Sequence, residues 1–262
     1  MAGEFDGKIV VVSGGSRGIG RAIAKAFATE GAQTVLAAAS EANLKKTADE
    51  IAATGAKKPD IVAGDLRQLD ACQKVFDAVS KTHGRCDILI NSAGATRAGA
   101  FLELTDENFQ DGFALKYFAA VRLCRLFWPM LAKQQGHVVN IIGGAARTPD
   151  SMFLIGGSVN AATANFTKGL SGQGKRDGVN VNAVHPGTTE TDRIFQLFEQ
   201  RAAASGRTPE QVREDTIKKE GLRRLGQPED VSALALFLCS ERARHIQGVA
   251  IAVDGGATSG LF

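Results

Sequence analysis

Short apolar runs alternate along this chain with longer segments in which apolar residues recur every three or four positions. Seven of these runs predict β-strands, at residues 9–13, 34–37, 60–63, 87–91, 137–142, 179–184 and 249–253. Most runs are uninterrupted rather than alternating, which is typical of parallel strands covered by helices on both faces. The regular alternation of strand and helix therefore predicts a doubly wound α/β sheet with right-handed crossovers.

The segments between these runs have the patterns of helices. Ile19, Ile23 and Phe27 recur every four residues, as on the buried face of a helix. Thr105 and Pro228 are each followed by two acidic residues. Such starts are favourable because carboxylates interact well with the positive end of the helix dipole. The chain has no internal repeat and no linker, so residues 1–262 are expected to form a single domain.

Residues 192–224 depart from this alternation. The segment is helical in composition and mixed in charge, and it lies between the end of a strand and the last predicted helix. Folds of this kind often place a substrate lid there, as an insertion into the domain. A pair of solvated surface helices explains the same composition, and the sequence leaves both interpretations open.

Composition narrows the class of protein. A chain of 262 residues with 44% hydrophobic content can bury one large core. A net charge of +3 is too small to indicate a nucleic-acid partner. We expect no membrane span, because no stretch approaches the roughly 20 apolar residues that one requires. The beginning of the chain does not resemble a signal peptide, and the four cysteines form no metal-binding pair. These features predict a cytoplasmic protein without a metal site.

A glycine-rich loop follows the first predicted strand. Gly14, Gly18 and Gly20 are spaced as Gly-x-x-x-Gly-x-Gly, directly before a helical pattern. Residues without Cβ let the backbone turn tightly and approach a pyrophosphate. The N-terminus of the following helix adds free N–H groups and a partial positive charge. This combination predicts a dinucleotide site.

Further short motifs follow the later strands. In chain order they are Gly64-Asp65-Leu66, Asn91-Ser92-Ala93-Gly94, Pro186-Gly187 up to Thr191, Gly226-Gln227-Pro228 and Val253-Asp254-Gly255-Gly256. Together with the glycine loop, these motifs resemble the short-chain dehydrogenase/reductase family, from residue 7 to residue 256. The resemblance implies a Rossmann fold with a seven-stranded parallel sheet, and an NAD(P)-dependent oxidoreductase acting on a small-molecule carbonyl. It also implies a homotetramer or homodimer.

The resemblance assigns a cofactor contact to residues at the carboxyl ends of the strands, where open α/β sheets bind ligands. The pyrophosphate and the adenosine ribose would contact Gly14, Ser16, Arg17, Gly18, Ile19 and Gly20. Asp65 and Leu66 would flank the adenine, and Asn91, Ala93 and Gly94 would line the middle of the cofactor. Pro186, Gly187 and Thr191 would contact the nicotinamide amide, and Asn160 its ribose.

The end of the second predicted strand bears on the choice between NAD(H) and NADP(H). An acidic residue there would pair with the ribose 2′-hydroxyl of NAD and repel the 2′-phosphate of NADP. The residue is Ala38, and Arg17 can bind a phosphate through two parallel hydrogen bonds. The sequence therefore favours NADP(H) over NAD(H). The nearby Glu41 argues in the opposite direction, and the Ser40 hydroxyl suits either cofactor.

The catalytic pattern of the family is broken in this chain. By alignment, Gly156 occupies the place of the proton-donating tyrosine, and Asn160 that of the lysine which acidifies it. Gly143 takes the place of the serine that orients the carbonyl, and Lys116 that of an asparagine on an earlier helix. Tyr117 is the only tyrosine of the chain, so no shift of the alignment restores the pattern.

Two of these four substitutions look like an exchange, because an asparagine has become Lys116 while a lysine has become Asn160. We hypothesise that Lys116 and Asn160 are catalytic. A partly desolvated Lys116 would donate the proton or organise a water that does, and Asn160 would still bind the ribose. The alternative is that Lys116 is a structural surface lysine and Asn160 reflects drift. His185 is a second candidate for proton relay, or a hydrogen-bonded packing residue.

Two functions remain open at this stage. The first is hydride transfer to a hydrophobic or activated carbonyl (a ketone, diketone or quinone) at a non-standard catalytic site. Apolar segments at residues 152–155 and 194–198 favour such a substrate, with Arg147 as a candidate anchor for a polar group. The second is a catalytically inactive scaffold or sensor that binds the cofactor. The apparently intact cofactor motifs favour the enzyme.

Overall fold

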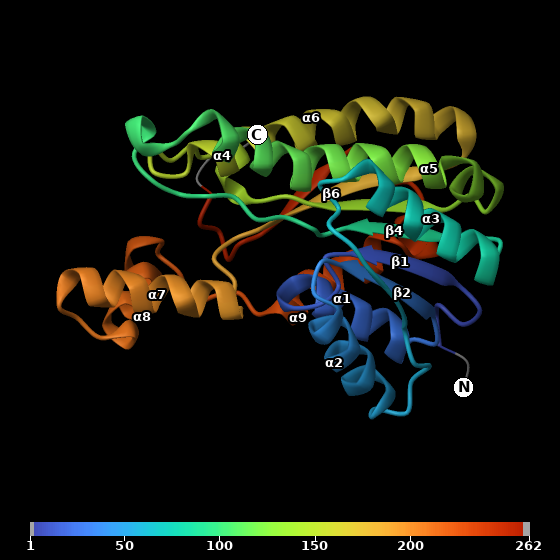
Figure 1. Cartoon of the computed structure of the whole chain (residues 1–262), viewed down its shortest axis with the longest axis horizontal. Coiled ribbons are helices and arrows are strands. Elements are labelled where there is room, and N and C mark those ends of the chain that lie inside the picture. The colour runs from blue at the N-terminus through green and yellow to red at the C-terminus, as the bar shows by residue number, and fades with distance from the viewer. Residues whose placement is uncertain (1–2, 259–262) are drawn as a thin grey trace.

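The computed structural model, which describes residues 3–258, contains a seven-stranded parallel sheet between two layers of helices (Figure 1). The strand order is β3-β2-β1-β4-β5-β6-β7. The strands are β1 (Ile9–Ser13), β2 (Gln33–Ala38), β3 (Asp60–Ala63), β4 (Ile88–Asn91), β5 (His137–Ile141), β6 (Asn180–Pro186) and β7 (Ala250–Val253). The doubly wound Rossmann fold predicted from the sequence is confirmed.

The helices divide between the two faces of the sheet. They are α1 (Gly18–Thr29), α2 (Glu41–Ala52), α3 (Leu69–Thr82), α4 (Asp106–Gly112), α5 (Ala119–Lys133), α6 (Leu154–Asp177), α7 (Asp192–Ser205), α8 (Pro209–Lys219) and α9 (Pro228–Leu238). Figure 1 shows α1, α2 and α9 on one face and α3, α5 and α6 on the other. The pair α7 and α8 projects beyond the sheet in the same view.

The uninterrupted apolar runs are explained by two cores, one on each face. Along β1, Val10 and Val12 pack into the core formed with α1 and α9. The alternate residues Ile9 and Val11 pack into the core formed with α3 and α5. Because successive side chains of a strand point to opposite faces, a strand covered on both faces is apolar at nearly every position.

Two local features differ from the sequence prediction. The strand expected to end at residue 184 continues to Pro186, because β6 pairs with β7 up to the Pro186–Val253 position. Between α4 and α5 the chain forms a π-helix, Phe113–Phe118, which carries Lys116. Such wide turns are rare and often accompany functional sites, and the hydrophobic pattern gives no sign of this one.

The ends of two predicted helices are confirmed by their hydrogen bonds. Thr105 caps α4 through a capping box with Asn108. Gln227 precedes α9, whose first residue is Pro228 and whose first turn is acidic. No helix within residues 3–258 is both long and apolar enough to cross a membrane.

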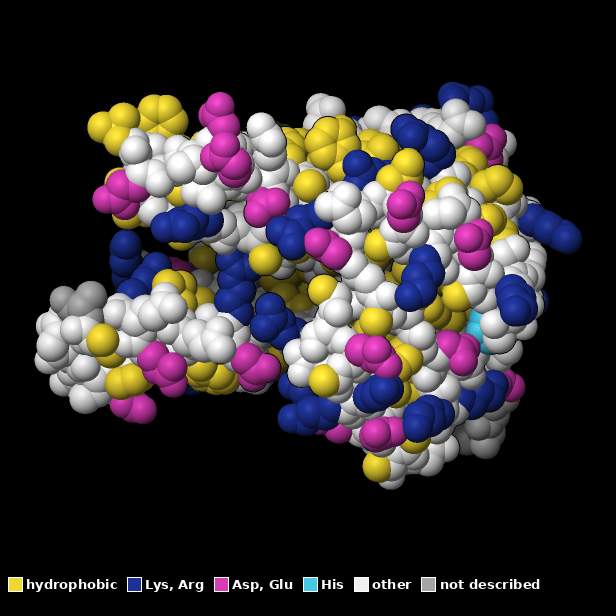
Figure 2. All heavy atoms as spheres, in the orientation of Figure 1, with side chains coloured by type: hydrophobic (Ala, Val, Ile, Leu, Met, Phe, Trp, Pro, Cys, Tyr) yellow, Lys and Arg dark blue, Asp and Glu magenta, His cyan; other side chains and the backbone are white. Residues whose placement is uncertain are grey.

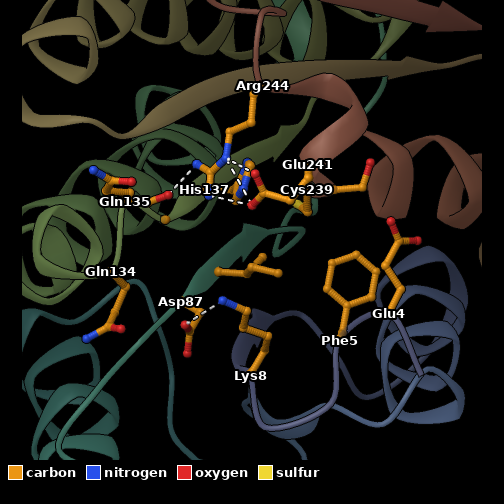
Figure 3. A pocket seen from close by; sticks show the side chains of 13 residues that line it. Glu4, Phe5, Lys8, Asp87, Gln134, Gln135, His137, Cys239, Glu241 and Arg244 are labelled. Atoms are coloured by element: carbon orange, nitrogen blue, oxygen red, sulfur yellow. Dashed lines mark hydrogen bonds and ion pairs between the residues drawn. The ribbon is translucent and has the colours of Figure 1, made fainter. Parts of the chain in front are cut away.

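A small cavity of about 70 Å³ lies at the amino ends of β4 and β5, the opposite edge from the predicted cofactor site (Figure 3). Asp87 is buried there and accepts hydrogen bonds from the Ile9 backbone (2.9 Å) and from Arg85 (3.0 Å). His137 is also buried, and its Nδ1 has no hydrogen-bond partner. Desolvation, aided by the nearby Arg244, lowers the pKa of His137 from 6.5 to about 4.

This depressed pKa of His137 predicts a loss of stability in acid. Above pH 6.5 the imidazole is neutral in both the folded and the unfolded chain, so it adds no pH dependence. Between pH 6.5 and about 4 only the unfolded chain takes up the proton, and stability falls by roughly 3 kcal/mol. The free energy of unfolding, measured by urea denaturation from pH 7 to 4, should therefore fall less steeply in His137→Gln than in the wild type. Equal slopes in the two proteins would contradict the prediction.

Candidate functional site

The glycine loop after β1 fits against the loop after β4. Gly14 has a φ of +73°, and a Cβ on it would lie 2.7 Å from the backbone nitrogen of Ala93. A Cβ on Gly20 would overlap the carbonyl oxygen of Gly14. Both positions therefore require glycine, for the backbone conformation at the first and for close approach at both. The structure thus joins two of the predicted cofactor segments.

A third segment meets the same loop. Gly18, with a φ of +54°, opens α1, and a Cβ on it would lie 3.3 Å from Cγ2 of Thr191. Thr191 in turn caps α7, its hydroxyl accepting a hydrogen bond from the backbone of Ile194. Arg17 precedes α1 without capping it through its side chain. The first N–H groups of α1 remain available to an anion, as a dinucleotide site requires.

Two other residues of the glycine loop are held by neighbouring helices. The carbonyl of Ser16 accepts a hydrogen bond from Thr47 Oγ1 (3.0 Å). Ile19 packs against the core beneath α1. Residues 14–20 therefore form a glycine cradle that contacts within the protein already hold in place.

The residues expected at the adenine end are engaged internally. Asp65 binds Arg67 through its carboxylate (2.8 Å), which lowers the pKa of Asp65. Leu66 is buried. Asn91 points into the interior, where its Nδ2 donates to Asn140 Oδ1 (2.8 Å). Its side chain thus fastens β4 to β5, and the contact of this segment with a ligand falls to its backbone and to the following residues.

Pro186 and Gly187 lie where β6 leaves the sheet. The Gly187 N–H donates to the carbonyl of Val253 (3.0 Å), and a Cβ on Gly187 would lie 2.7 Å from Cβ of Asp254. The close packing of these two strand ends explains why glycine is needed after the proline. Most of the predicted cofactor residues therefore lie together at one end of the sheet, where the carboxyl ends of β1, β4 and β6 meet.

An aromatic ring fills the space next to Gly156. A Cβ on Gly156 would overlap Cε1 and Cζ of the Phe153 ring. Phe153 stands at the start of α6 and is half-buried. A tyrosine at position 156 could not coexist with this ring position. The sequence showed that no tyrosine stands at position 156. It did not indicate that the ring of Phe153, three positions earlier, occupies the space beside Gly156.

A carboxamide fills the corresponding space next to Gly143. A Cβ on Gly143 would lie 2.7 Å from Nδ2 of Asn160. The carbonyl of Gly143 is 3.0 Å from Nδ1 of His185, which is buried and donates this hydrogen bond from its protonated nitrogen. Burial lowers the pKa of His185, so the ring is neutral near pH 7. His185 thus anchors the loop after β5.

Lys116 reaches the predicted cofactor site from the π-helix. Its aliphatic chain lies over Gly94, where an added Cβ would be 3.0 Å from the Lys116 Cδ. Desolvation and, secondarily, the positive charge of Arg193 lower the pKa of Lys116 from 10.5 to about 8. Lys116 is therefore half-buried at the edge of the site rather than a freely solvated surface lysine.

Arg193 belongs to the site although the sequence did not single it out. From the first turn of α7, its Nη2 donates to the carbonyl of Thr96 (2.9 Å), so the side chain bridges α7 and the loop after β4. Burial and the charge of Arg17 lower the pKa of Arg193. Figure 2 shows lysine and arginine side chains gathered around the hollow between the α7–α8 pair and the rest of the molecule. Such a hollow favours an anionic ligand.

Only some of the apolar side chains that were expected to line the substrate site are available to contact a ligand. Met152 and Phe195 are exposed, at 53% and 44%, so both can contact a ligand. Phe198 instead packs inside the small core between α7 and α8. Arg147 donates to the carbonyl of Ala250 (2.7 Å), so its guanidinium is already engaged by the backbone. The proposed role of Arg147 as a polar anchor would require that contact to open.

Known proteins are similar to this chain in both sequence and fold. A family model described as "Enoyl-(Acyl carrier protein) reductase" matches residues 14–258. The oxidoreductase UcpA of Salmonella typhimurium is 30% identical over 98% of this chain and 96% of its own.

Two solved structures of similar proteins contain a nicotinamide cofactor. The L-sorbose reductase of Gluconobacter frateurii, complexed with NADPH and L-sorbose, superimposes with a TM-score of 0.94 at 30% identity, covering all of both chains. A short-chain dehydrogenase of Burkholderia cenocepacia, in complex with NADP, gives a TM-score of 0.85 at 29% identity, over 97% and 99% of the two chains. The match of family model, relatives and fold shows that this protein belongs to the short-chain dehydrogenase/reductase family and is an NAD(P)-dependent oxidoreductase acting on CH–OH and C=O groups.

Proposed function

We propose that this protein reduces a carbonyl compound with NADP(H) and that the ammonium group of Lys116 supplies the proton. The observation that carries the proposal is the position of Lys116, half-buried across Gly94 with its pKa lowered to about 8. Gly94 belongs to the loop after β4, which packs against the glycine loop after β1, so the aliphatic chain of Lys116 lies beside the predicted cofactor site.

The chemistry requires one acid from the protein. When bound, the nicotinamide supplies a hydride to the carbonyl carbon, and the carbonyl oxygen must then gain a proton. The Lys116 Nζ would transfer a proton to that oxygen and become a neutral amine, which solvent reprotonates. An ammonium group with a pKa near 8 is a stronger acid than one at 10.5, and a donor matched to the operating pH is the most effective.

We propose a hydrophobic or activated carbonyl as the substrate, namely a ketone, a diketone or a quinone. Phe153, Met152 and Phe195 supply apolar and aromatic surface near the site. An activated carbonyl suits a lysine acid, because its oxyanion is already partly stabilised. The L-sorbose bound by the similar Gluconobacter reductase makes polyhydroxy ketones a further class worth testing.

The α7–α8 pair is proposed as a substrate lid inserted at residues 192–224. It has its own small core of Phe198, Ala202, Val212 and Leu225. Ion pairing of Glu190 with Arg213 (2.9 Å) ties it to the loop after β6. A segment with an independent core and a few polar ties can move as a unit.

The surroundings of α2 support NADP(H) over NAD(H). Ala38 ends β2 without a carboxylate, and Ser40 caps α2. Glu41, which argued against a phosphate in the sequence, forms an ion pair with Lys45 (2.7 Å). The pairing offsets its negative charge. Arg17 stands directly before α1, in the loop after the neighbouring strand β1. This leaves Arg17 as the candidate partner of a 2′-phosphate.

A homotetramer is proposed, as the family resemblance implies. β7 is one of the two edge strands of the sheet, and its residues are only half-buried. Phe118, at the start of α5, is 46% exposed. Both surfaces would be covered by copies of the same chain.

Removing the ammonium group of Lys116 should abolish most of the activity. In Lys116→Met we expect kcat for carbonyl reduction to fall by about 10²–10⁴, because that is the usual contribution of a positioned acid. NADPH oxidation is followed at 340 nm with ketones, diketones, quinones and sugars. The exposed Lys133 in α5 gives a matched control, Lys133→Met. Unchanged turnover in Lys116→Met would refute the role of Lys116. Tight NADPH binding with no turnover on any carbonyl would instead favour a cofactor-binding scaffold.

The pKa of Lys116 also predicts a pH profile. The ammonium form is the acid and is lost as pH rises through about 8, so kcat for reduction should be level below this pH. Above it, kcat should fall about tenfold per pH unit. Alcohol oxidation needs the neutral amine and should show the opposite slope. A wild-type profile that is flat from pH 6 to 10, in steps limited by chemistry, would count against the proposal.

Arg17 should determine the preference between the two cofactors. Arg17→Ala is expected to weaken NADPH binding by about tenfold or more, since hydrogen bonds to charged groups contribute about 1.5–3 kcal/mol. NADH binding should change much less, because NADH lacks the 2′-phosphate. Arg21→Ala is the control, since Arg21 in the same helix pairs with Glu50 instead. Fluorescence titration gives both affinities. An equal loss for NADPH and NADH would place Arg17 at the shared pyrophosphate.

A further inference from the structure

Arg193 completes a ring of contacts at the predicted cofactor site. The glycine loop after β1 packs against the loop after β4 at Gly14, and against the start of α7 at Gly18. In the first turn of α7, the Nη2 of Arg193 donates to the carbonyl of Thr96 in the loop after β4 (2.9 Å). Three segments that are distant in sequence therefore meet at one place. Of the three contacts, only that of Arg193 is made by a charged side chain.

The guanidinium of Arg193 keeps hydrogen-bond donors for a ligand. Arginine has five N–H donors, and the bond to Thr96 is the one hydrogen bond of this side chain within residues 3–258. Burial and the positive charge of Arg17 lower the pKa of Arg193, and no carboxylate is among the causes. The side chain is nevertheless accessible to solvent. This combination is expected of a group that lines an open cleft, such as the hollow beside the α7–α8 pair (Figure 2).

Arg193 lies between two other cations of the site. The charge of Arg17, which directly precedes α1, acts on Arg193. The charge of Arg193 in turn acts on Lys116, whose pKa is lowered first by desolvation and then by this neighbour. Arg17 is the proposed partner of the 2′-phosphate, and Lys116 the proposed acid at the carbonyl. Because the pyrophosphate joins these two halves of a dinucleotide, the intermediate position of Arg193 matches that of the pyrophosphate.

We propose that the guanidinium of Arg193 binds the pyrophosphate of the nicotinamide cofactor. The glycine loop and the first N–H groups of α1 hold the phosphates from one side, and Arg193 contacts them from the α7 side. The family resemblance assigned no role to this residue. The inference rests on the cofactor binding in the proposed function and is independent of the proposed role of Lys116.

The physical basis is the match between a guanidinium and a phosphate. The rigid fork of N–H groups can donate two parallel hydrogen bonds to phosphate oxygens. The negative charges of a pyrophosphate also offset the repulsion among Arg17, Lys116 and Arg193, for which the protein supplies no counter-ion among the causes of the lowered pKa values. Since Arg193 belongs to α7, the bound cofactor is tied to the first turn of the proposed lid.

Binding measurements on Arg193→Met test the inference, because methionine removes the charge and keeps an unbranched side chain. The Kd values of NADPH and NADH should both rise by about 10- to 100-fold, the usual effect of losing a hydrogen bond to a charged group. Inorganic pyrophosphate should compete with NADPH less well in the variant than in the wild type. The affinity for adenosine 2′-monophosphate, which has no pyrophosphate, should change little. Fluorescence titration and calorimetry give these values.

Two further variants serve as controls. Arg193→Lys keeps the positive charge and should recover part of the affinity for both cofactors. Arg201→Met removes an exposed arginine from the same helix and should bind both cofactors as the wild type does. Thermal unfolding reports whether each variant folds, and Arg193→Lys keeps the test decisive if the methionine variant does not.

The possible outcomes separate the proposal from its alternatives. A loss of affinity for NADPH alone would overturn it in favour of a contact with the 2′-phosphate. An equal loss for adenosine 2′-monophosphate would indicate a general distortion of the site and overturn it. Unchanged Kd values would also overturn it, and a raised KM for the carbonyl substrate would then assign Arg193 to the substrate. The expected loss of binding without turnover on any carbonyl would refute the proposed reduction and leave this inference intact.

Discussion

The contact between the loop after β1 and the loop after β4 is the constraint on which the rest of the site depends. Gly14 and Ala93 approach so closely that a Cβ on the glycine would lie 2.7 Å from the Ala93 nitrogen. This contact sets where α1 begins and where Gly94 lies. Gly94 then forms the surface over which Lys116 extends. A side chain at Gly14 would displace the glycine cradle and the Lys116 position together.

Other groups fill the space beside the two glycines at which the family resemblance implies a catalytic serine and tyrosine. Phe153 takes the volume next to Gly156, and Asn160 takes the volume next to Gly143. Packing inside a protein is dense, so a large side chain lost from a wall leaves a void unless a neighbour fills it. Asn160 lies in α6, and Phe153 directly precedes that helix.

The positive charges at this site are a second distinctive feature, beside its shape. Lys116 and Arg193 are both desolvated, and the causes of their lowered pKa values include another cation but no carboxylate. Like charges held together without a counter-ion are unfavourable until an anion arrives. The phosphates of a dinucleotide would relieve that repulsion. Desolvation, the larger cause, lowers the pKa of Lys116 to about 8, into the range useful for acid catalysis.

The sequence by itself determined the fold of this protein and predicted where its cofactor would bind. Apolar runs of strand length must be covered on both faces, and Gly14 and Gly20 reflect backbone approaches that no other residue permits, so both could be predicted. The sequence also located the four substituted positions, by resemblance. Only the tertiary structure decided what fills them. That Phe153 lies against Gly156, that Asn160 lies against Gly143, and that Arg193 bridges to Thr96 depend on how separate elements pack. Contacts of this kind leave no periodic pattern along the chain, because they arise from packing density and desolvation rather than from local propensity.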